Sequence, residues 1–299
     1  DVLITLGAGA LRDAVATAED YPVDGARWLS SFVEDAILLR HAHQERGTST
    51  GWRAVDALYT VAPGELTVMT GVPGSGKSEW LDALMINLAQ FDGWTFAIYS
   101  PENQPGEQHF VKLAQKYLRK PYWPGPTTPM TDNEIRAFGS WAGDRFLFFD
   151  PERPTLETII GLARGFVFRK GIRGLVIDPW NRLDHSRPAG VTLTEYVRDF
   201  LAQLSAFAKR NDVHVWLTAH PKKMEVVGGV PSVPTAYDIS DSAHFFNMAD
   251  NIIVVNRNKS DETSPVDIIL QKVRFQRVGR IGTAQLFYDR VTGRYREVV

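Results

Sequence analysis

The sequence predicts an α/β fold in which a mostly parallel central sheet is flanked by helices, with antiparallel strands added toward the C-terminus. Three observations lead to this expectation. A glycine-rich loop near residue 71 joins an apolar strand to a helix, strands and helices alternate over residues 52–219, and residues 251–299 read as successive strands separated by turns. Alternation is typical of parallel sheets, because a helix usually makes the crossover between two parallel strands.

Composition places the chain among ordinary globular proteins. Hydrophobic residues make up 44% of its 299 residues and charged residues 23%, which suits one large α/β domain with an appendage or two small domains. The absence of cysteine excludes disulfides, thiolate zinc sites and cysteine nucleophiles, and fits a reducing compartment. The formal net charge of −2 indicates that any nucleic-acid site is a local basic surface.

The sequence shows neither a membrane span nor a secretory signal. No uninterrupted apolar run approaches the roughly 20 residues that a membrane helix needs. Residues 1–10 lack the basic segment of a signal peptide, and the chain starts with Asp1 rather than Met. We therefore expect a processed product or a piece of a longer protein.

The N-terminal part differs in character from the rest. Residues 10–18 form a short alanine-rich helix pattern, residues 28–46 a second helical stretch, and residues 47–51 read as a linker or turn. These features predict a short helical linker region at 1–48 and a single larger domain at 49–299.

The elements of the larger domain follow from apolar runs and turn-forming residues. Residues 65–70 and 174–178 are nearly continuously apolar, and Thr155 is a typical N-cap for a helix that reaches Lys170. Residues 121–131 are rich in proline and predict a rigid connection, while the irregular loop 222–240 is either functional or disordered. The other predicted elements are strands at 95–100, 146–150, 213–219, 251–257, 266–273, 285–289 and 294–299, and helices from 79 and over 194–211.

The glycine-rich loop matches the phosphate-binding pattern G-x-x-x-x-G-K-[ST] at every fixed position. Its glycines let backbone N–H groups turn toward phosphates, and the helix N-terminus that follows adds a favourable dipole. An ordinary glycine-rich turn is the alternative, but strand, loop and helix all agree with the motif. The pattern predicts a nucleoside triphosphate site in which Lys77 binds phosphates and Ser78 binds Mg²⁺. The cofactor-binding residues are Gly71, Pro73, Gly74, Ser75, Gly76, Lys77 and Ser78.

Two acidic residues are candidates for the chemistry of hydrolysis. Asp178 ends an apolar strand about a hundred residues after Lys77, where an acid can hold Mg²⁺ opposite the phosphate loop. Glu102 directly follows the strand 95–100 at the same sheet edge, which suits a general base for the attacking water. The alternative for Glu102 is that it caps a helix starting near Gly106.

Two further features have both an ordinary and a functional interpretation. His220 ends the strand 213–219, where it is either a γ-phosphate sensor or a histidine satisfied at a strand end, and spacing alone favours the second. Lys272 and Arg274 lie two apart on a predicted strand and so share one face. Such a charge run is usually solvated, but it also suits an arginine finger for a neighbouring subunit.

With these residues in place, the sequence resembles the hexameric ring helicases of the DnaB and Twinkle type, whose motor is a RecA-like domain. The resemblance covers nearly the whole chain from about Gly51, and residues 240–251 are most similar to Twinkle-like primase-helicases. The segments that carry it are Pro63–Leu66, Ser100–Asn103, Val176–Asn181, Thr218–Pro221, Asp238–Phe245, Ala249–Asn251 and Lys272–Arg274, with Gly279.

The resemblance implies roles that spacing does not show. Glu102 would be the catalytic glutamate, Asp178 the Mg²⁺-associated aspartate and His220 the γ-phosphate sensor. Arg274 would be a finger contributed in trans, with Lys272 beside it. Residues up to about Val23 would be the tail of an upstream primase-like domain with a linker helix, which in such rings packs on the adjacent subunit.

The resemblance also implies that two loops line a central channel and bind single-stranded DNA. Each loop offers only two cations, but a ring multiplies them, and backbone amides of the glycine-rich loop can add to the grip. Tyr237 is the only aromatic candidate for base stacking there. The DNA-binding cations would be Arg182 and Arg187 in the loop after Asp178, and Lys222 and Lys223 in the loop 222–240.

We therefore expect the motor domain of a ring-shaped replicative DNA helicase that uses Mg²⁺ and ATP, or another NTP or dNTP, to translocate on single-stranded DNA and unwind duplexes. Its expected partners are a replication fork, a primase or polymerase, and further copies in a hexamer or heptamer, without a membrane. The expected compartment is the cytoplasm of a bacterium or phage-infected cell, with the mitochondrial matrix as alternative. A RecA-like recombinase and a non-motor ring scaffold remain alternative functions.

Overall fold

The computed structural model describes residues 27–41, 46–125, 127–186, 189–227, 230–239, 243–259, 261 and 263–298. The chain divides into two compact units, Asp1–Glu45 and Arg46–Val299. The described part of the first unit consists of the 3-10 helix η1 (Leu29–Phe32) and helix α3 (Val33–His41), within the stretch expected to be helical. The helix predicted at residues 10–18 lies outside the described residues.

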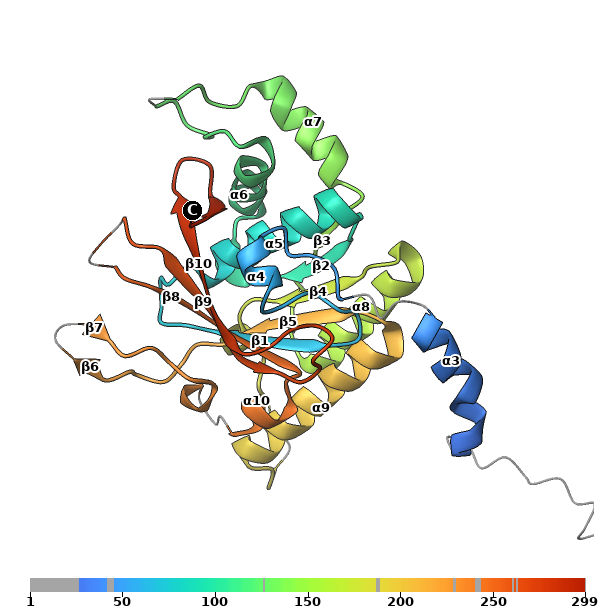
Figure 1. Ribbon diagram of the computed structural model, residues 1–299. Helices are drawn as coiled ribbons and strands as arrows, with labels where there is room; N and C mark the ends of the chain where they lie inside the picture. The colour runs from blue at the N-terminus through green and yellow to red at the C-terminus, as the bar shows by residue number, and fades with distance from the viewer. Residues whose placement is uncertain are drawn as a thin grey trace, which may run out of the picture. The chain divides into compact units, whose positions relative to one another are not determined.

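The second unit is built on one sheet, whose nine described strands lie in the order β11-β10-β9-β8-β1-β5-β4-β2-β3 (Figure 1). From β8 to β3 neighbouring strands are parallel, whereas β8 to β11 pair antiparallel. The predicted sheet is therefore confirmed, including its antiparallel C-terminal part. The strands are β1 (Leu66–Thr70), β2 (Phe96–Tyr99), β3 (Phe146–Phe148), β4 (Gly174–Ile177), β5 (His214–Thr218), β8 (Asn251–Arg257), β9 (Val266–Val273), β10 (Gly282–Asp289) and β11 (Arg294–Glu297).

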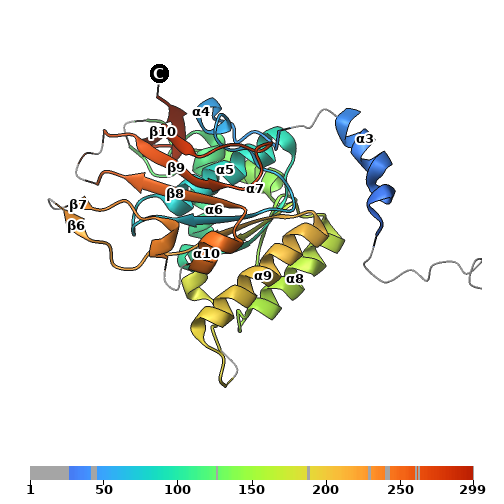
Figure 2. The ribbon, with the colours of Figure 1, turned by 60° about the horizontal axis from the view of Figure 1, so that its bottom comes forward.

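Helices cover both faces of this sheet. Figure 2 shows α8 and α9 side by side on one face with α10 next to them, while α4, α5 and α6 lie on the other face (Figures 1 and 2). Thr155 caps α8 as predicted, because its side chain accepts a hydrogen bond from the backbone N–H of Thr158. The helices are α4 (Arg53–Asp56), α5 (Lys77–Asp92), α6 (Gly106–Leu118), α7 (Asp132–Ala142), α8 (Leu156–Lys170), α9 (Leu193–Asn211) and α10 (Ala243–Met248), and the 3-10 turns are η2 (Pro101–Asn103), η3 (Trp180–Arg182) and η4 (Ala236–Asp238).

Side chains of the central strands alternate between two apolar cores. On β4, Ile177 packs in the core under α8 and α9, whereas its neighbour Val176 packs in the core under α5. Leu217 and Trp216 of β5 divide between the two cores in the same way. Because successive side chains point to opposite faces, burial on both sides explains why these strands are almost uniformly apolar.

Several elements were not predicted from the sequence. Helix α7 begins with a capping box in which Thr131 and Glu134 satisfy each other's backbone N–H groups, directly after the proline-rich residues 121–131. The loop 222–240 contains a small hairpin of β6 (Val226–Val227) and β7 (Val230–Pro231), and η4. Helix α10 follows it. The hairpin strands, η4 and α10 are short, so apolar periodicity gives little signal for them. Helix α7, by contrast, could have been predicted from its capping box and from the helical spacing of Ile135, Phe138 and Trp141.

Candidate active site

The phosphate-binding loop connects the central strand β1 to the N-terminus of α5. Gly76 has φ +98°, a conformation that glycine adopts more easily than other residues. A Cβ atom at Gly71 would lie 2.3 Å from the carbonyl oxygen of Val255 on β8, so no side chain fits there. Both glycines are therefore required by the local backbone.

Lys77 points back into this loop, where its Nζ donates a hydrogen bond to the Gly71 carbonyl at 2.8 Å. Burial lowers the pKa of Lys77, while Asp178 and Glu102 oppose this shift. The hydroxyl of Ser75 is also buried, and among the described residues it has no hydrogen-bond partner. A buried ammonium beside an unpartnered hydroxyl and a helix N-terminus fits a phosphate group, which accepts hydrogen bonds.

Asp178 lies at the end of β4, beside this loop, and is 5% exposed. Burial raises its pKa, whereas hydrogen bonds from Thr218 and Ser78 and the charge of Lys77 lower it. The Thr218 hydroxyl donates to Asp178 Oδ1 at 2.5 Å. Hard oxygen donors from an aspartate and a serine are the ligands that Mg²⁺ prefers, so the two side chains fit the metal of a nucleotide–Mg²⁺ complex.

Glu102 lies in η2, directly after β2 at the same sheet edge. It does not cap α6: the N-cap of that helix is Pro105, with no side-chain capping bond. Instead, Glu102 Oε1 accepts a hydrogen bond from Arg182 Nε at 3.1 Å, and Oε2 lies 3.8 Å from His220 Nε2. The helix-capping alternative for Glu102 is therefore wrong.

His220 follows β5 and faces both Glu102 and the phosphate loop. Its backbone N–H donates to Asn181 Oδ1 at 3.1 Å, and its Nδ1 is buried without a partner among the described residues. Burial lowers the pKa of His220, Lys77 lowers it further, and Glu102 and Asp178 oppose the shift. A neutral imidazole with an unpartnered nitrogen differs from the satisfied strand-end histidine that spacing favours.

These side chains line one cavity of about 250 Å³. The structure thus brings together Lys77, Ser78, Glu102, Asp178 and His220, which are far apart in the sequence. Sequence reasoning missed Lys112, whose Nζ contacts Glu79 Oε1 at 3.1 Å and Asn103 Oδ1 at 2.9 Å. No local pattern marks it, because it is one of several polar residues on α6. The lining residues are Gly74, Gly76, Lys77, Ser78, Glu79, Glu102, Asn103, Lys112, Asp178 and His220.

Arg274 and Lys272 lie at the opposite end of the parallel strands, where β1 and β8 begin. Arg274 Nη1 is 2.7 Å from Oδ1 of Asp250, the residue that immediately precedes β8. Lys272 Nζ donates to the Phe246 carbonyl at 2.6 Å. Strand β1 separates this end from the phosphate loop by about 17 Å, at about 3.3 Å per residue. Arg274 therefore does not reach the phosphate loop of its own chain.

Three of the four candidate DNA-binding cations lie within the described residues. Arg182 pairs with Glu102, Arg187 lies outside the described residues, and Lys222 Nζ contacts Asp238 Oδ1 at 3.2 Å. Lys223 is exposed. These positions do not test the DNA-binding assignment, which remains a prediction.

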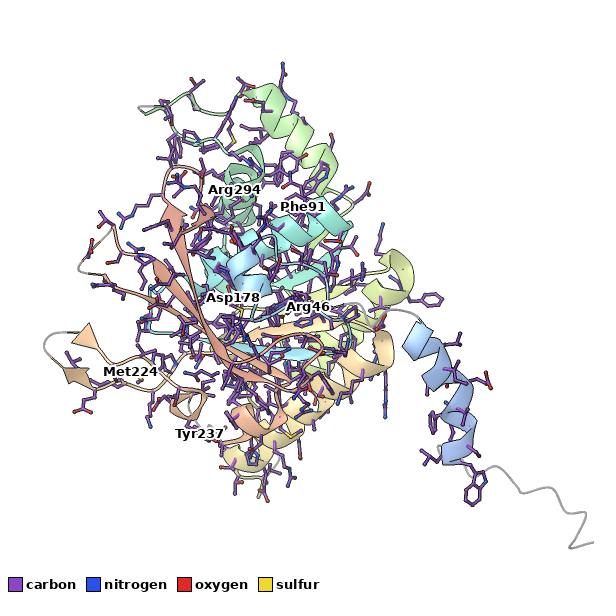
Figure 3. The ribbon with its side chains drawn as sticks, viewed as in Figure 1. Arg46, Phe91, Asp178, Met224, Tyr237 and Arg294 are labelled. Atoms are coloured by element: carbon purple, nitrogen blue, oxygen red, sulfur yellow. The ribbon has the colours of Figure 1, made fainter. Side chains whose placement is uncertain are left out.

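The aromatic candidate of this region is Tyr237, which is 54% exposed. Figure 3 shows Met224 and Tyr237 on the side of the unit that carries the β6–β7 hairpin and α10, away from Asp178. The ring of Tyr237 stacks on Phe246, with ring centroids 4.8 Å apart. The loop 222–240 is therefore anchored to α10 on one side by an aromatic stack.

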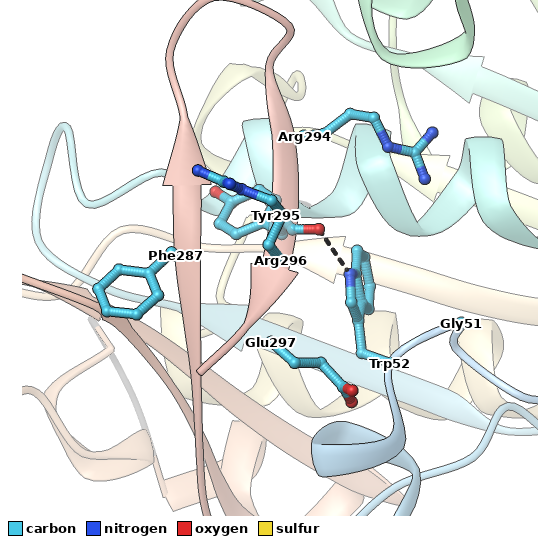
Figure 4. A pocket seen from close by; sticks show the side chains of 7 residues that line it. All are labelled: Gly51, Trp52, Phe287, Arg294, Tyr295, Arg296 and Glu297. Atoms are coloured by element: carbon cyan, nitrogen blue, oxygen red, sulfur yellow. Dashed lines mark hydrogen bonds between the residues drawn. The ribbon is translucent and has the colours of Figure 1, made fainter. Parts of the chain in front are cut away.

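A larger cavity of about 620 Å³ lies at the edge strand β11 (Figure 4). There Trp52 Nε1 donates to the Tyr295 carbonyl at 3.1 Å, which closes part of the strand edge. Tyr295 also separates this cavity from the phosphate loop, since its hydroxyl lies 3.5 Å from the Gly76 carbonyl. Among the residues that line it, none is a predicted site residue, so the smaller cavity is the candidate active site.

The chain is similar in sequence to a member of a known protein family. No family model matches the chain. The chain is 42% identical over 307 residues to the "Twinkle homolog protein, chloroplastic/mitochondrial" of Arabidopsis thaliana, an alignment that covers 99% of this chain and 43% of the relative. The chain thus spans less than half the length of that relative.

Two solved structures have the same fold. One, described as an ATPase domain, superposes with a TM-score of 0.74, at 17% identity over 94% of this chain and all of that one. A DnaB-like replicative helicase, described with its interactions with primase, superposes with a TM-score of 0.75, at 17% identity over 97% of this chain and 71% of that one. The RecA-like fold and the resemblance to the Twinkle and DnaB type are confirmed.

Proposed function

We propose that this chain, a Twinkle-like protein with the fold of a DnaB-like helicase ATPase domain, is the NTP-driven motor of a replicative DNA helicase. The observation that carries the proposal is the meeting of Lys77, Asp178 and Glu102 around one cavity, while Arg274 lies at the opposite sheet edge. Among the described residues no arginine lines this cavity, and a second copy would supply one. We further propose a closed ring, most simply a hexamer, in which residues 1–48 link the motor of residues 49–299 to an upstream primase-like domain.

Residues on this chain fit a Mg²⁺–nucleotide complex. Lys77 and the amides of the phosphate loop would hold phosphates, and Ser78 and Asp178 would hold the metal, which neutralises charge on the phosphates when bound. The hydroxyls of Thr218 and Ser78 orient the Asp178 carboxylate, and together with Lys77 they favour its ionised form. ATP is the simplest substrate, and another NTP or dNTP is the alternative.

Glu102 is the proposed general base. Its Oε atoms lie at the cavity beside His220, where a carboxylate can accept a proton from water as the water attacks the γ-phosphorus. The Arg274 guanidinium of a neighbouring copy would stabilise the charge that develops on the transferred phosphoryl group. His220 would transmit the state of the cavity to the loop 222–240, which begins two residues later.

The proposed work is translocation on single-stranded DNA and separation of the duplex ahead of the ring. Arg182, Arg187, Lys222 and Lys223 are the proposed contacts to the DNA backbone. A primase or polymerase is a further proposed partner. The Arabidopsis relative is named as chloroplastic/mitochondrial. For this chain we propose the cytoplasm of a bacterium or phage-infected cell, with the mitochondrial matrix as alternative. None of the helices in the described ranges is long and apolar enough to cross a membrane.

A forked DNA substrate tests this proposal. With Mg²⁺ and ATP the protein should displace the labelled strand, and with a non-hydrolysable ATP analogue it should bind the fork without displacing it. A Glu102→Gln variant should behave with ATP as the wild type does with the analogue. Strand exchange on filaments in place of fork unwinding, or nucleotide-dependent rings without DNA-stimulated hydrolysis, would replace the helicase by a recombinase or a scaffold.

A further inference from the structure

Arg182 forms an ion pair with the proposed general base. Its Nε donates to Glu102 Oε1 at 3.1 Å, and its side chain is 61% exposed compared with 39% for Glu102. Glu102 lines the candidate active-site cavity, whereas Arg182 does not. The pair therefore joins a group inside the cavity to a cation that faces outward.

The backbone around Arg182 is held at both sides. The Tyr99 hydroxyl, at the end of β2, donates to the Arg182 carbonyl at 3.0 Å. Asn181 Oδ1 accepts the backbone N–H of His220, at the end of β5. Since η3 is fixed to two strand ends, a change of partner for Arg182 involves mainly its side chain.

The ion pair has a consequence for the chemistry of Glu102. A carboxylate oxygen that accepts a hydrogen bond from a guanidinium has its charge compensated and one of its lone pairs occupied. It is then a weaker acceptor for the proton of an attacking water. The other oxygen, Oε2, lies 3.8 Å from His220 Nε2.

A phosphate diester competes well for an exposed arginine. Arginine and phosphate can form two parallel charge-assisted hydrogen bonds, whereas the observed contact with Glu102 uses the single Nε donor. Exposed ion pairs are weak, so exchange of partners needs little energy. A polyanion that reaches η3 can therefore draw the guanidinium away from Glu102.

We propose that Arg182 is a positioning residue that holds Glu102 in the absence of DNA and moves to a backbone phosphate when single-stranded DNA binds. The released carboxylate then accepts the proton of the attacking water, as oxygen bonds to the γ-phosphorus and the nucleoside diphosphate leaves. This inference rests on the proposed function and adds to it the means by which DNA accelerates hydrolysis.

Turnover measured with and without an oligo-deoxythymidine strand tests the inference. Arg182→Gln should raise DNA-free turnover by about two- to fivefold, the range expected for loss of an exposed ion pair, and should lower stimulation by DNA by the same factor. Arg182→Lys keeps the charge and should retain low DNA-free turnover. The control is Arg198→Gln on α9. It removes an exposed ion pair with Asp199, neither residue lines the cavity, and it should change neither rate.

Binding of the oligonucleotide gives a second readout that does not depend on turnover. With a non-hydrolysable ATP analogue present, Glu102→Gln should bind the strand about two- to fivefold more tightly. Glu102 and a DNA phosphate compete for Arg182, so weakening one contact strengthens the other. The double variant Glu102→Gln, Arg182→Gln should lose this gain. The salt dependence of binding should also decrease by about one phosphate contact in Arg182→Gln.

The outcomes separate the inference from the function on which it rests. If wild-type protein does not hydrolyse NTP, or DNA does not stimulate it, the proposed function itself is wrong. If wild-type hydrolysis is stimulated by DNA but Arg182→Gln keeps the full stimulation, or loses turnover equally with and without DNA, only the role of Arg182 is refuted.

Discussion

The carboxyl-terminal and amino-terminal ends of the parallel strands, here called the first and second edge of the sheet, use polar side chains in opposite ways. At the edge where β1, β2, β4 and β5 end, polar groups surround a cavity, and Ser75 and His220 each keep a buried polar atom without a partner among the described residues. At the other edge, the buried groups bind each other: Asp250 accepts the Leu66 N–H at 2.9 Å, and Asn251 donates to Glu65 at 2.8 Å.

This difference shows which edge is built to receive a ligand. A buried polar group without a partner costs free energy of folding, so its retention beside a cavity indicates a partner that arrives from outside. Asn251 Oδ1 at the second edge also lacks a partner among the described residues, but it lines neither of the two cavities described above. Arg274 is the exception at the second edge, since it is paired with Asp250 but remains 35% exposed, and can therefore serve a second copy.

The strongest test of the first edge removes its buried ammonium. Lys77→Ala should lower NTP turnover to background, a loss of about 10³-fold or more, because no other described cation reaches the loop carbonyl of Gly71 as Lys77 does. Steady-state phosphate release measures the effect. Lys209→Ala, an exposed lysine on α9, is the matched control and should keep normal turnover. Substantial hydrolysis by Lys77→Ala would show that the cavity is not the active site.

The next test asks whether the second edge completes the first edge of a neighbour. Arg274→Ala should abolish turnover but leave nucleotide binding largely intact, and it also leaves the buried Asp250 carboxylate unpaired. Arg274→Lys keeps a charge for Asp250 and should still lose about 10³-fold in turnover, since a lysine does not reproduce the planar guanidinium. A severe loss of nucleotide binding in Arg274→Lys would count against the finger assignment.

Mixing two inactive variants sharpens this comparison. Lys77→Ala subunits still present Arg274, and Arg274→Lys subunits still have an intact phosphate loop. In mixed assemblies, some interfaces combine both intact halves, so turnover should reappear on mixing. If no turnover returns although the variants assemble together, a cavity completed in trans is excluded.

The smallest expected effect concerns stability at the second edge. His214 is fully buried, with Nδ1 donating to the Ala62 carbonyl at 2.6 Å and Nε2 accepting from Thr67 at 2.8 Å. Burial lowers its pKa from 6.5 to about 4. Between these values the unfolded chain binds a proton that the native chain does not. Stability is therefore lost as the pH falls from 6.5 to 4, by roughly 3 kcal/mol from this group, with no further loss below.

Urea unfolding at several pH values measures this contribution. His214→Gln should be less stable at neutral pH but should show a shallower decrease of the unfolding free energy between pH 6.5 and 4. An unchanged slope in the variant would assign the pH dependence to other groups.

Local sequence patterns were sufficient for most of the fold. The strands at 251–257 and 266–273 begin and end where predicted, and β1, β4 and β5 differ from prediction by a residue at one or both ends. Apolar runs predict such strands well because both faces are buried. The β6–β7 hairpin was missed because a two-residue strand contains few apolar positions, whereas helix α7 was missed although its capping box and apolar spacing are visible in the sequence.

The candidate site was only partly predictable. The strand ends that hold Glu102, Asp178 and His220 could be inferred, because parallel strands place their carboxyl ends at one edge. Which of these side chains contact each other depends on strand order, with β4 between β2 and β5. That order brings Arg182 to Glu102, a pair that the sequence places 80 residues apart.

The sequence by itself determined that the chain has a phosphate-binding loop within a parallel α/β sheet, because both signals lie in consecutive residues and their local backbone. Tertiary structure alone decided that Arg182 pairs with Glu102, that Lys112 enters the cavity, and that Asp250 holds Arg274 at the far edge. These contacts join residues from different strands and helices, and their free energies depend on packing and burial that no local pattern specifies.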